Sequence, residues 1–333
     1  MLKRSHVFLF ILLLMGQRAL AQDPQLSQFY AAPLYLNPAL TGSTFQDRLA
    51  LNYRLQWPAI GPGYRTYALS YDHHSQATHS GIGGYVMHDQ AGSFGLAFTQ
   101  MALSYSYEAR LDRKRAIRGG LRVGYTMRNY DPSNLLFADQ VIRDNAPTTI
   151  EPTMLENVSY MDFSGGLLYF TEQFWAGISM NHVNKPEETF FLDGDVPLPI
   201  RTSVHAGYRF SVDGRSFLRS KTRMTLAMQY KAQQKWDQLD IGGYVDHESI
   251  TFGLWYRGLP VVKSYEPGDP NDESVVLMFG YETPYQLRMV YSYDVTISQL
   301  TMKSGGAHEI SVIYEWPKRG KHRHYRAIPC PKF

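Results

Sequence analysis

Hydrophobic and polar residues alternate with a period of two along much of this chain, and residues 116–128 show the pattern best. Side chains on a β-strand point to opposite faces in turn, so this segment predicts a strand with one apolar face and one polar face. The apolar face carries Ile117, Leu121, Val123, Tyr125 and Met127, and the other face carries Arg118, Arg122, Thr126 and Arg128. A wall between lipid and a hydrated lumen needs this arrangement.

Fourteen segments share this alternation, and together they predict an all-β fold, a transmembrane outer-membrane β-barrel of about 14 antiparallel strands. An even strand number is usual for bacterial outer-membrane barrels. The predicted strands are 48–57, 64–72, 80–89, 92–107, 116–128, 162–170, 174–182, 202–210, 222–231, 236–247, 250–257, 275–283, 286–294 and 308–316.

The connections between these strands are sorted by length. Those after odd-numbered strands include the long segments 129–161, 183–201 and 258–274. Those after even-numbered strands include the short segments 171–173 and 248–249. Outer-membrane barrels have long extracellular loops and short periplasmic turns, whereas a soluble β-sandwich has no reason to separate loop lengths in this way. The asymmetry therefore favours a membrane barrel.

The N-terminus predicts a cleaved signal peptide over residues 1–21. Lys3 and Arg4 precede an apolar stretch at 7–15, and Ala19-Leu20-Ala21 forms a small-residue cleavage site. The apolar stretch is far shorter than the ~20 residues that a membrane-spanning helix needs. The rest of the chain divides into a leader at 22–47, the barrel at 48–316 and a basic periplasmic tail at 317–333.

Charge and cysteine content refine this picture. The formal net charge is +3, and the predicted signal peptide contains three basic residues and no acidic one. The tail is cationic and contains no acid, so it is either a contact for a periplasmic partner or simply a solvated terminus. The candidate contacts are Lys318, Arg319, Lys321, Arg323 and Arg326. Cys330 is the sole cysteine, which excludes an intrachain disulfide.

The motifs give no support for catalysis, a cofactor or a metal. Asp72, His73, His74 and His79 lie in a predicted periplasmic turn, and their spacing does not bring three ligands to one face. Gly81-Ile82-Gly83-Gly84 precedes a strand rather than a helix, so it is not a dinucleotide-binding loop. No nucleophile-elbow motif occurs. We therefore expect no catalytic, cofactor-binding or metal-binding residues, and no binding to nucleic acid.

Glycines recur inside the predicted strands, where they weaken regular pairing. Examples are Gly119-Gly120, Gly165-Gly166, Gly242-Gly243 and Gly253. Strongly curved barrel walls or a plug lying against the wall would both explain them. The leader is polar and rich in proline, so it either folds into the lumen as a plug or lies along the periplasmic rim. Its candidate contacts are Leu34, Leu36, Asn37 and Leu40.

Particular segments resemble the PorP/SprF family of the Bacteroidota type IX secretion system. The opening block of the mature chain carries the most specific part of this resemblance, and further blocks extend it to the C-terminus. The similar segments are 22–30, 33–42, 52–54, 56–58, 70–72, 293–296, 304–311 and 330–333.

This resemblance implies a non-enzymatic outer-membrane barrel that assists export and cell-surface attachment of a partner. The implied partners are a large secreted surface protein with a type IX C-terminal signal, periplasmic ring or translocon components, and outer-membrane lipid. A general porin is the main alternative, in which Arg118, Arg122 and Arg128 would line a pore. A barrel enzyme that acts on lipids is a third possibility.

Overall fold

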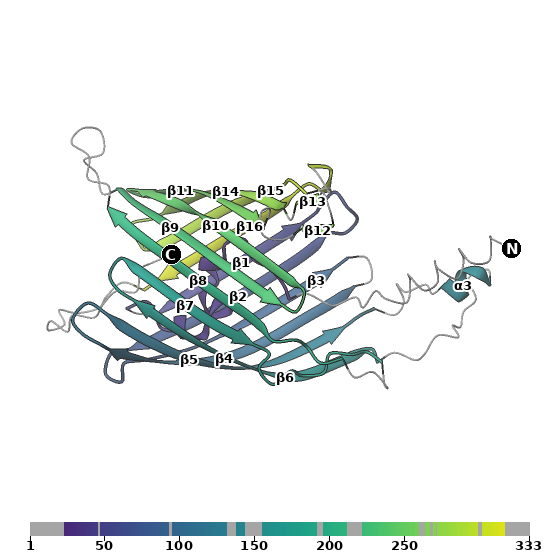
Figure 1. Ribbon diagram of the computed structural model, residues 1–333, viewed down its shortest axis with the longest axis horizontal. Helices are drawn as coiled ribbons and strands as arrows, with labels where there is room; N and C mark the ends of the chain where they lie inside the picture. Colours follow the sequence, from purple (N-terminus) through teal and green to yellow (C-terminus); the bar gives the residue numbers. More distant parts are fainter. Residues whose placement is uncertain are drawn as a thin grey trace.

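The structure is a computed structural model, and its strands form a closed antiparallel barrel (Figure 1). Fourteen strands follow one another around the ring in sequence order, and each pairs with its neighbours in the chain. The residues described are 23–45, 47–92, 95–131, 138–143, 155–191, 196–211, 222–259, 264–266, 269–270, 272–298 and 302–316.

All fourteen predicted strands are confirmed. The barrel consists of β1 (Arg48–Gln56), β2 (Tyr64–Ser75), β3 (Ser80–Ala91), β4 (Leu96–Arg110), β5 (Ala116–Asn129), β6 (Asn157–Phe170), β7 (Phe174–Asn181), β8 (Arg201–Ser211), β9 (Thr222–Gln233), β10 (Trp236–His247), β11 (Ile250–Gly258), β14 (Asp272–Glu282), β15 (Leu287–Thr296) and β16 (Ala307–Glu315).

Five predicted boundaries differ from the structure by three to five residues, and three of them have a clear cause. β4 begins at Leu96 instead of residue 92, because Gly92 and Gly95 adopt positive φ angles in the preceding turn. β6 begins at Asn157 instead of residue 162, since its first residues pair with the end of β5 although they lack strict alternation. β2 continues to Ser75, so His73 and His74 lie in a strand and not in the predicted turn.

The first and last strands close the ring. β1 pairs with β16 along its full length, from Arg48 opposite Glu315 to Gln56 opposite Ala307. Closure leaves no sheet edge, so the strands satisfy one another's backbone hydrogen bonds without water. Because lipid offers no hydrogen bonds, this closure is what allows a β-structure to cross a membrane.

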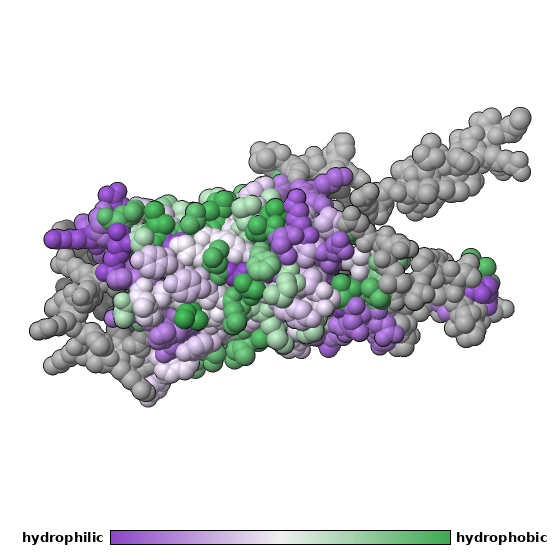
Figure 2. All heavy atoms as spheres, turned by 90° about the horizontal axis from the view of Figure 1, so that it is seen from below, coloured by the Kyte–Doolittle hydropathy of each residue, from purple (hydrophilic) through white to green (hydrophobic). Residues whose placement is uncertain are grey.

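The two faces of the wall differ as the alternation predicts. Leu121 is 68% exposed on the outside, whereas its neighbour Arg122 is 3% exposed on the inside. The space-filling view shows hydrophobic residues gathered over the middle of the outer surface and hydrophilic residues toward both ends (Figure 2). Lipid contact around the middle and water contact at the ends suit this distribution.

The three longest connections lie at one end as predicted, although that end also has the short turn 234–235 and the other end has the longer connection 212–221. At one end the connections span 57–63, 92–95, 130–156, 182–200, 234–235, 259–271 and 297–306, and at the other end 76–79, 111–115, 171–173, 212–221, 248–249 and 283–286. We name these the long-connection end and the short-connection end.

The remaining elements are small. The leader contains η1 (Phe29–Ala31), α2 (Pro33–Leu36) and η2 (Pro38–Leu40). The long-connection end carries α3 (Ala138–Ile142), the strand pair β12 (Ser264–Glu266) and β13 (Asp269–Pro270), and η4 (Met302–Ser304). Within the described residues, no helix is both long enough and apolar enough to cross a membrane.

The outward face of β5 provides a test of lipid exposure. A Leu121→Arg substitution places a cation on the lipid-facing surface, and we expect it to lower the free energy of unfolding by about 2–4 kcal/mol. Leu111→Arg, in the exposed turn before β5, is the control and should cost about 0–1 kcal/mol. Chemical unfolding in lipid vesicles measures both values, and equal costs would contradict a lipid-facing Leu121.

Candidate functional site

The leader lies inside the ring of strands (Figure 1). Asp23 contacts Arg201, the first residue of β8, which is at the long-connection end. Gly42 donates its backbone N–H to Asp72, near the end of β2, and there the chain is at the short-connection end. Residues 23–42 of the leader therefore extend through the lumen between the two ends.

Prolines and one asparagine shape the leader. Pro33 and Pro38 occupy the first positions of α2 and η2, where a missing N–H is tolerated and the fixed φ angle favours a helical turn. The Asn37 side chain accepts a 2.9 Å hydrogen bond from the Ala39 N–H and so caps η2. These short turns give a compact segment that could not continue as a strand of the wall.

An ionic contact holds the start of the leader. The Asp23 carboxylate lies 2.7 Å from Arg201 Nη1 and 2.8 Å from His182 Nε2. The other ring nitrogen of His182 lies 3.0 Å from the Asp162 carboxylate of β6. The Tyr35 hydroxyl accepts a hydrogen bond from Arg201 and donates one to the Pro24 carbonyl. We refer to Asp23, His182 and Arg201 as the entry latch.

The charges of the entry latch shift one another's protonation. Burial lowers the pKa of the His182 imidazole, but Asp23 and Asp162 outweigh it and raise that pKa from 6.5 to about 9. Burial raises the pKa of the Asp23 carboxyl, but His182 and Arg201 hold it well below its usual range. Both groups are therefore charged at neutral pH, and the contact is an ion pair.

A second polar cluster binds the next residues of the leader. The N–H groups of Ser27 and Gln28 donate to the Glu309 carboxylate of β16 at 2.6 and 3.0 Å. The Ser27 hydroxyl donates to Asp294 of β15 at 2.5 Å. The guanidinium groups of Arg54 and Arg257 pair with Asp294 at 3.1 and 3.0 Å. Two buried carboxylates and two buried guanidinium groups thus balance at this position.

Aromatic packing follows deeper in the lumen. The Phe29 ring meets the Trp255 ring edge to face, with 5.2 Å between their centroids. Tyr30 stacks on Trp255 at 6.3 Å and lies against Tyr244 at 5.9 Å. Phe29 and Tyr30 are both almost fully buried, so this part of the leader has a hydrophobic core of its own with β10 and β11.

The four sequence-predicted leader contacts, Leu34, Leu36, Asn37 and Leu40, lie inside the barrel and are between 0 and 4% exposed. Asn37 Nδ2 lies 3.2 Å from the carbonyl oxygens of Leu167 and Ile178, which belong to β6 and β7. The Leu36 carbonyl accepts a hydrogen bond from Ser179. These bonds attach the middle of the leader to the wall.

Glycines in the wall make room for the leader. A Cβ atom at Gly120 would overlap the backbone of Pro38 and Ala39, and one at Gly166 would overlap the Asn37 side chain. A Cβ atom at Gly81 would overlap the Thr41 carbonyl. Sequence reasoning left plug contact and wall curvature open as the reason for such glycines, and at these three positions the reason is contact with the leader.

If the protein were a porin, Arg118, Arg122 and Arg128 would line its pore. In the structure, each of these arginines has a partner within the protein. Arg122 donates to the Leu34 carbonyl at 3.0 Å and also binds Ser164 and Asn181. Arg118 pairs with Glu108, and Arg128 pairs with Glu188. All three arginines are also buried, with exposures between 3 and 9%.

The other candidate residues are dispersed. Asp72 and His74 point inward from β2, whereas His73 points outward and lies 2.6 Å from Asp47. In the part of the chain that is described, no three His, Cys, Asp or Glu side chains converge as a metal site. The predicted signal peptide and the basic tail, with Lys318, Arg319, Lys321, Arg323, Arg326 and Cys330, fall outside the described residues.

Comparison with known proteins gives one family. The profile described as "Type IX secretion system membrane protein PorP/SprF" matches residues 19–314, which is most of the chain. The comparison with curated proteins gives no match.

Among solved structures, the chain is similar to the Acinetobacter baumannii outer membrane protein Omp33, with a TM-score of 0.44 and 7% identity over 82% of this chain and 98% of that chain. It is also similar to the Pseudomonas putida toluene transporter TodX, with a TM-score of 0.45 and 13% identity over 85% and 92% of the two chains. The barrel itself is established by its own strand pairing.

The contact at Gly120 predicts how the leader can be displaced. A Gly120→Val substitution puts a side chain where the leader backbone lies, and overpacking of this kind costs about 1–3 kcal/mol. We expect chymotrypsin to cleave the leader near Phe29 and Tyr30, and we expect ion conductance in planar bilayers to rise above that of the unchanged protein.

Gly119→Val is the matched control for this substitution. A Cβ atom at Gly119 would meet only the Leu167 side chain, at an ordinary 3.7 Å on the outer face. This variant should resist chymotrypsin and conduct no more than the unchanged protein. If both variants behaved alike, the wall glycine would not be what accommodates the leader.

The entry latch predicts a pH dependence. Because the pKa of folded His182 is about 9, its stabilising contribution is complete below pH 6.5 and disappears as the pH rises through about 9. The contribution is about 3 kcal/mol. Chymotrypsin sensitivity of the leader, measured between pH 6 and 10, should therefore rise on the alkaline side. A His182→Gln variant should lose this dependence, and an unchanged profile in that variant would refute the latch.

Proposed function

The chain belongs to the PorP/SprF family of type IX secretion system membrane proteins, and from this premise we propose that it is a non-enzymatic outer-membrane barrel that assists export and surface attachment of a partner secreted protein. The partner we propose is a large surface protein that carries a type IX C-terminal signal. Two features of the structure support this role, namely the filled lumen and the separation of the long connections to one end.

The filled lumen supports a role that uses the outside of the protein. The leader binds most strands of the wall through buried polar contacts, including those of Ser27, Asn37 and Gly42. A leader bound in the lumen in this way narrows any path for solutes, in contrast to the water-filled channel of a porin. The porin alternative is therefore less consistent with the structure than an adaptor role.

The long-connection end is the surface that we propose for the partner. The connections 130–156, 182–200 and 259–271 all emerge there, and long loops are extracellular in outer-membrane barrels. A partner that is held at the cell surface must contact the barrel at its extracellular end. We therefore assign partner recognition to these connections.

The opposite end suits components of the periplasm. β16 ends at Glu315, opposite Arg48 at the start of β1, so the basic tail leaves from the short-connection end. The cations of the tail would bind an acidic surface of the periplasmic ring or translocon. They are Lys318, Arg319, Lys321, Arg323 and Arg326. In this arrangement one barrel contacts the secretion machinery on one side and its product on the other.

A connection exchange tests the proposal. We expect replacement of 130–156 and 259–271 with the corresponding segments of a family relative to reduce attachment of the original partner by about tenfold or more, since a loss of ~1.4 kcal/mol in binding has that effect. Immunofluorescence of whole cells measures the attached partner, and immunoblotting confirms equal amounts of barrel.

The control exchanges the turns 76–79 and 111–115 at the short-connection end, and it should leave attachment unchanged. Undiminished attachment after exchange of the long connections would exclude them as the recognition surface.

A further inference from the structure

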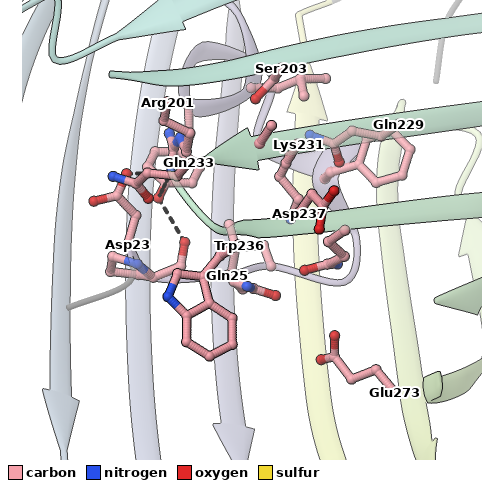
Figure 3. A pocket seen from close by; sticks show the side chains of 17 residues that line it. Asp23, Gln25, Arg201, Ser203, Gln229, Lys231, Gln233, Trp236, Asp237 and Glu273 are labelled. Atoms are coloured by element: carbon pink, nitrogen blue, oxygen red, sulfur yellow. Dashed lines mark hydrogen bonds and ion pairs between the residues drawn. The ribbon is translucent and has the colours of Figure 1, made fainter. Parts of the chain in front are cut away.

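A cavity of about 240 Å³ lies between the leader and the wall formed by β8, β9 and β10, near the long-connection end. Figure 3 shows the side chains of Arg201, Ser203, Gln229 and Lys231 around it, with Asp23 and Gln25 of the leader nearby. One side of the cavity is therefore the leader itself. The volume is below the roughly 300–1,000 Å³ typical of sites for drug-sized molecules, so a ligand here would be smaller.

One polar group of the cavity has unused hydrogen-bonding capacity. The Gln229 side-chain oxygen is buried and has no hydrogen-bond partner among the residues that the structure describes. The Ser203 hydroxyl and the Gln25 amide line the same cavity, and Ser203 is 3% exposed. Buried polar groups are normally satisfied, and an unsatisfied group costs about 1–3 kcal/mol. A ligand that bonded to the Gln229 oxygen would remove this cost, and Ser203 and Gln25 would supply further hydrogen bonds.

The charged groups of the cavity are already compensated. Arg201 pairs with Asp23 at 2.7 Å, and Glu273 lies 3.6 Å from Arg257. The Lys231 ammonium lies 3.9 Å from the Asp240 carboxylate, and the Asp237 carboxylate accepts a 3.2 Å hydrogen bond from the Tyr230 hydroxyl. The site therefore has no strong net charge that would select an anion or a cation.

The rest of the lining is apolar or aromatic. Leu26, Phe29 and Leu36 of the leader supply an apolar surface, and Trp236, which is 44% exposed, contributes its indole. A site that combines a flat apolar surface with amides and a hydroxyl suits a ring that has apolar C–H faces and hydroxyl groups around its edge. Hydroxyls both donate and accept hydrogen bonds, as do the side chains of Gln25, Gln229 and Ser203.

We propose that this cavity binds a neutral, polyhydroxylated ring of monosaccharide size. The ring would be either a free sugar or the terminal residue of a surface glycan, since both present the same hydroxyl pattern. Because the leader forms one side of the site, an occupied cavity stabilises the leader in the lumen. The proposal concerns the cavity alone and does not depend on the role in secretion.

The test is isothermal titration of the full-length mature protein in lipid nanodiscs. The probes are glucose, galactose, mannose, rhamnose and N-acetylglucosamine, each as the free sugar and as its methyl glycoside. Binding of at least one sugar is expected. A sugar that still binds as its glycoside can be the end of a glycan chain, whereas one that binds only in free form is a free ligand.

Two variants locate the binding. Gln229→Met and Ser203→Ala should each weaken it by about tenfold, the effect of losing one buried hydrogen bond. Gln229→Met should not lower the thermal midpoint, because it removes a buried oxygen that has no hydrogen-bond partner among the described residues. Ser104→Ala is the matched control, since the buried Ser104 hydroxyl of β4 also lacks a partner among these residues but lies outside the cavity.

Specific results would overturn the proposal. One is that no sugar binds at 10 mM, which is roughly the weakest affinity expected of a specific site. Another is that the unchanged protein, Gln229→Met and Ser203→Ala all bind the sugar equally well. Weakening by Ser104→Ala as well would also overturn it, because the effect would then not come from the cavity.

Discussion

Charged and polar side chains that point into a closed barrel need partners there, and this requirement governs the rest of the structure. Arg54, Arg257, Asp294 and Glu309 are each no more than 4% exposed. Removal of one partner from a buried ion pair costs about 3–5 kcal/mol, so such groups need partners close by. Ser27 and Gln28 of the leader supply part of them, since they donate three hydrogen bonds to the two carboxylates. The polar groups of the wall therefore fix the position of the leader, and the leader in turn supplies partners to those groups.

The wall accommodates the leader in both shape and polarity. Where the leader backbone approaches most closely, the wall carries Gly81, Gly120 and Gly166. Gly42 of the leader has a φ of +63°, and a Cβ atom there would lie 2.7 Å from the Cα of Gly81. Glycine therefore occurs on both sides of this contact. A segment that lay loosely in a wide pore would not need such close fitting.

The sequence predicted the wall much better than the leader's place within it. Period-two alternation, as at Leu121 and Arg122, is a local signal that a strand shows by itself, so all fourteen strands could be identified. The path of the leader depends on contacts between residues far apart in the chain, such as Ser27 with Glu309. No local pattern marks them. The Gln229 oxygen, which has no hydrogen-bond partner among the described residues, likewise depends on how distant strands pack and has no local signal.

Amide hydrogen exchange of the leader tests the central claim most directly, because a segment held in the lumen is shielded from solvent and hydrogen-bonded to the wall. In the full-length protein in lipid, the amides of Ser27, Gln28, Ala39 and Gly42 should exchange as slowly as those of the barrel strands. Exchange at the rate of an unstructured peptide would contradict a leader bound inside the barrel.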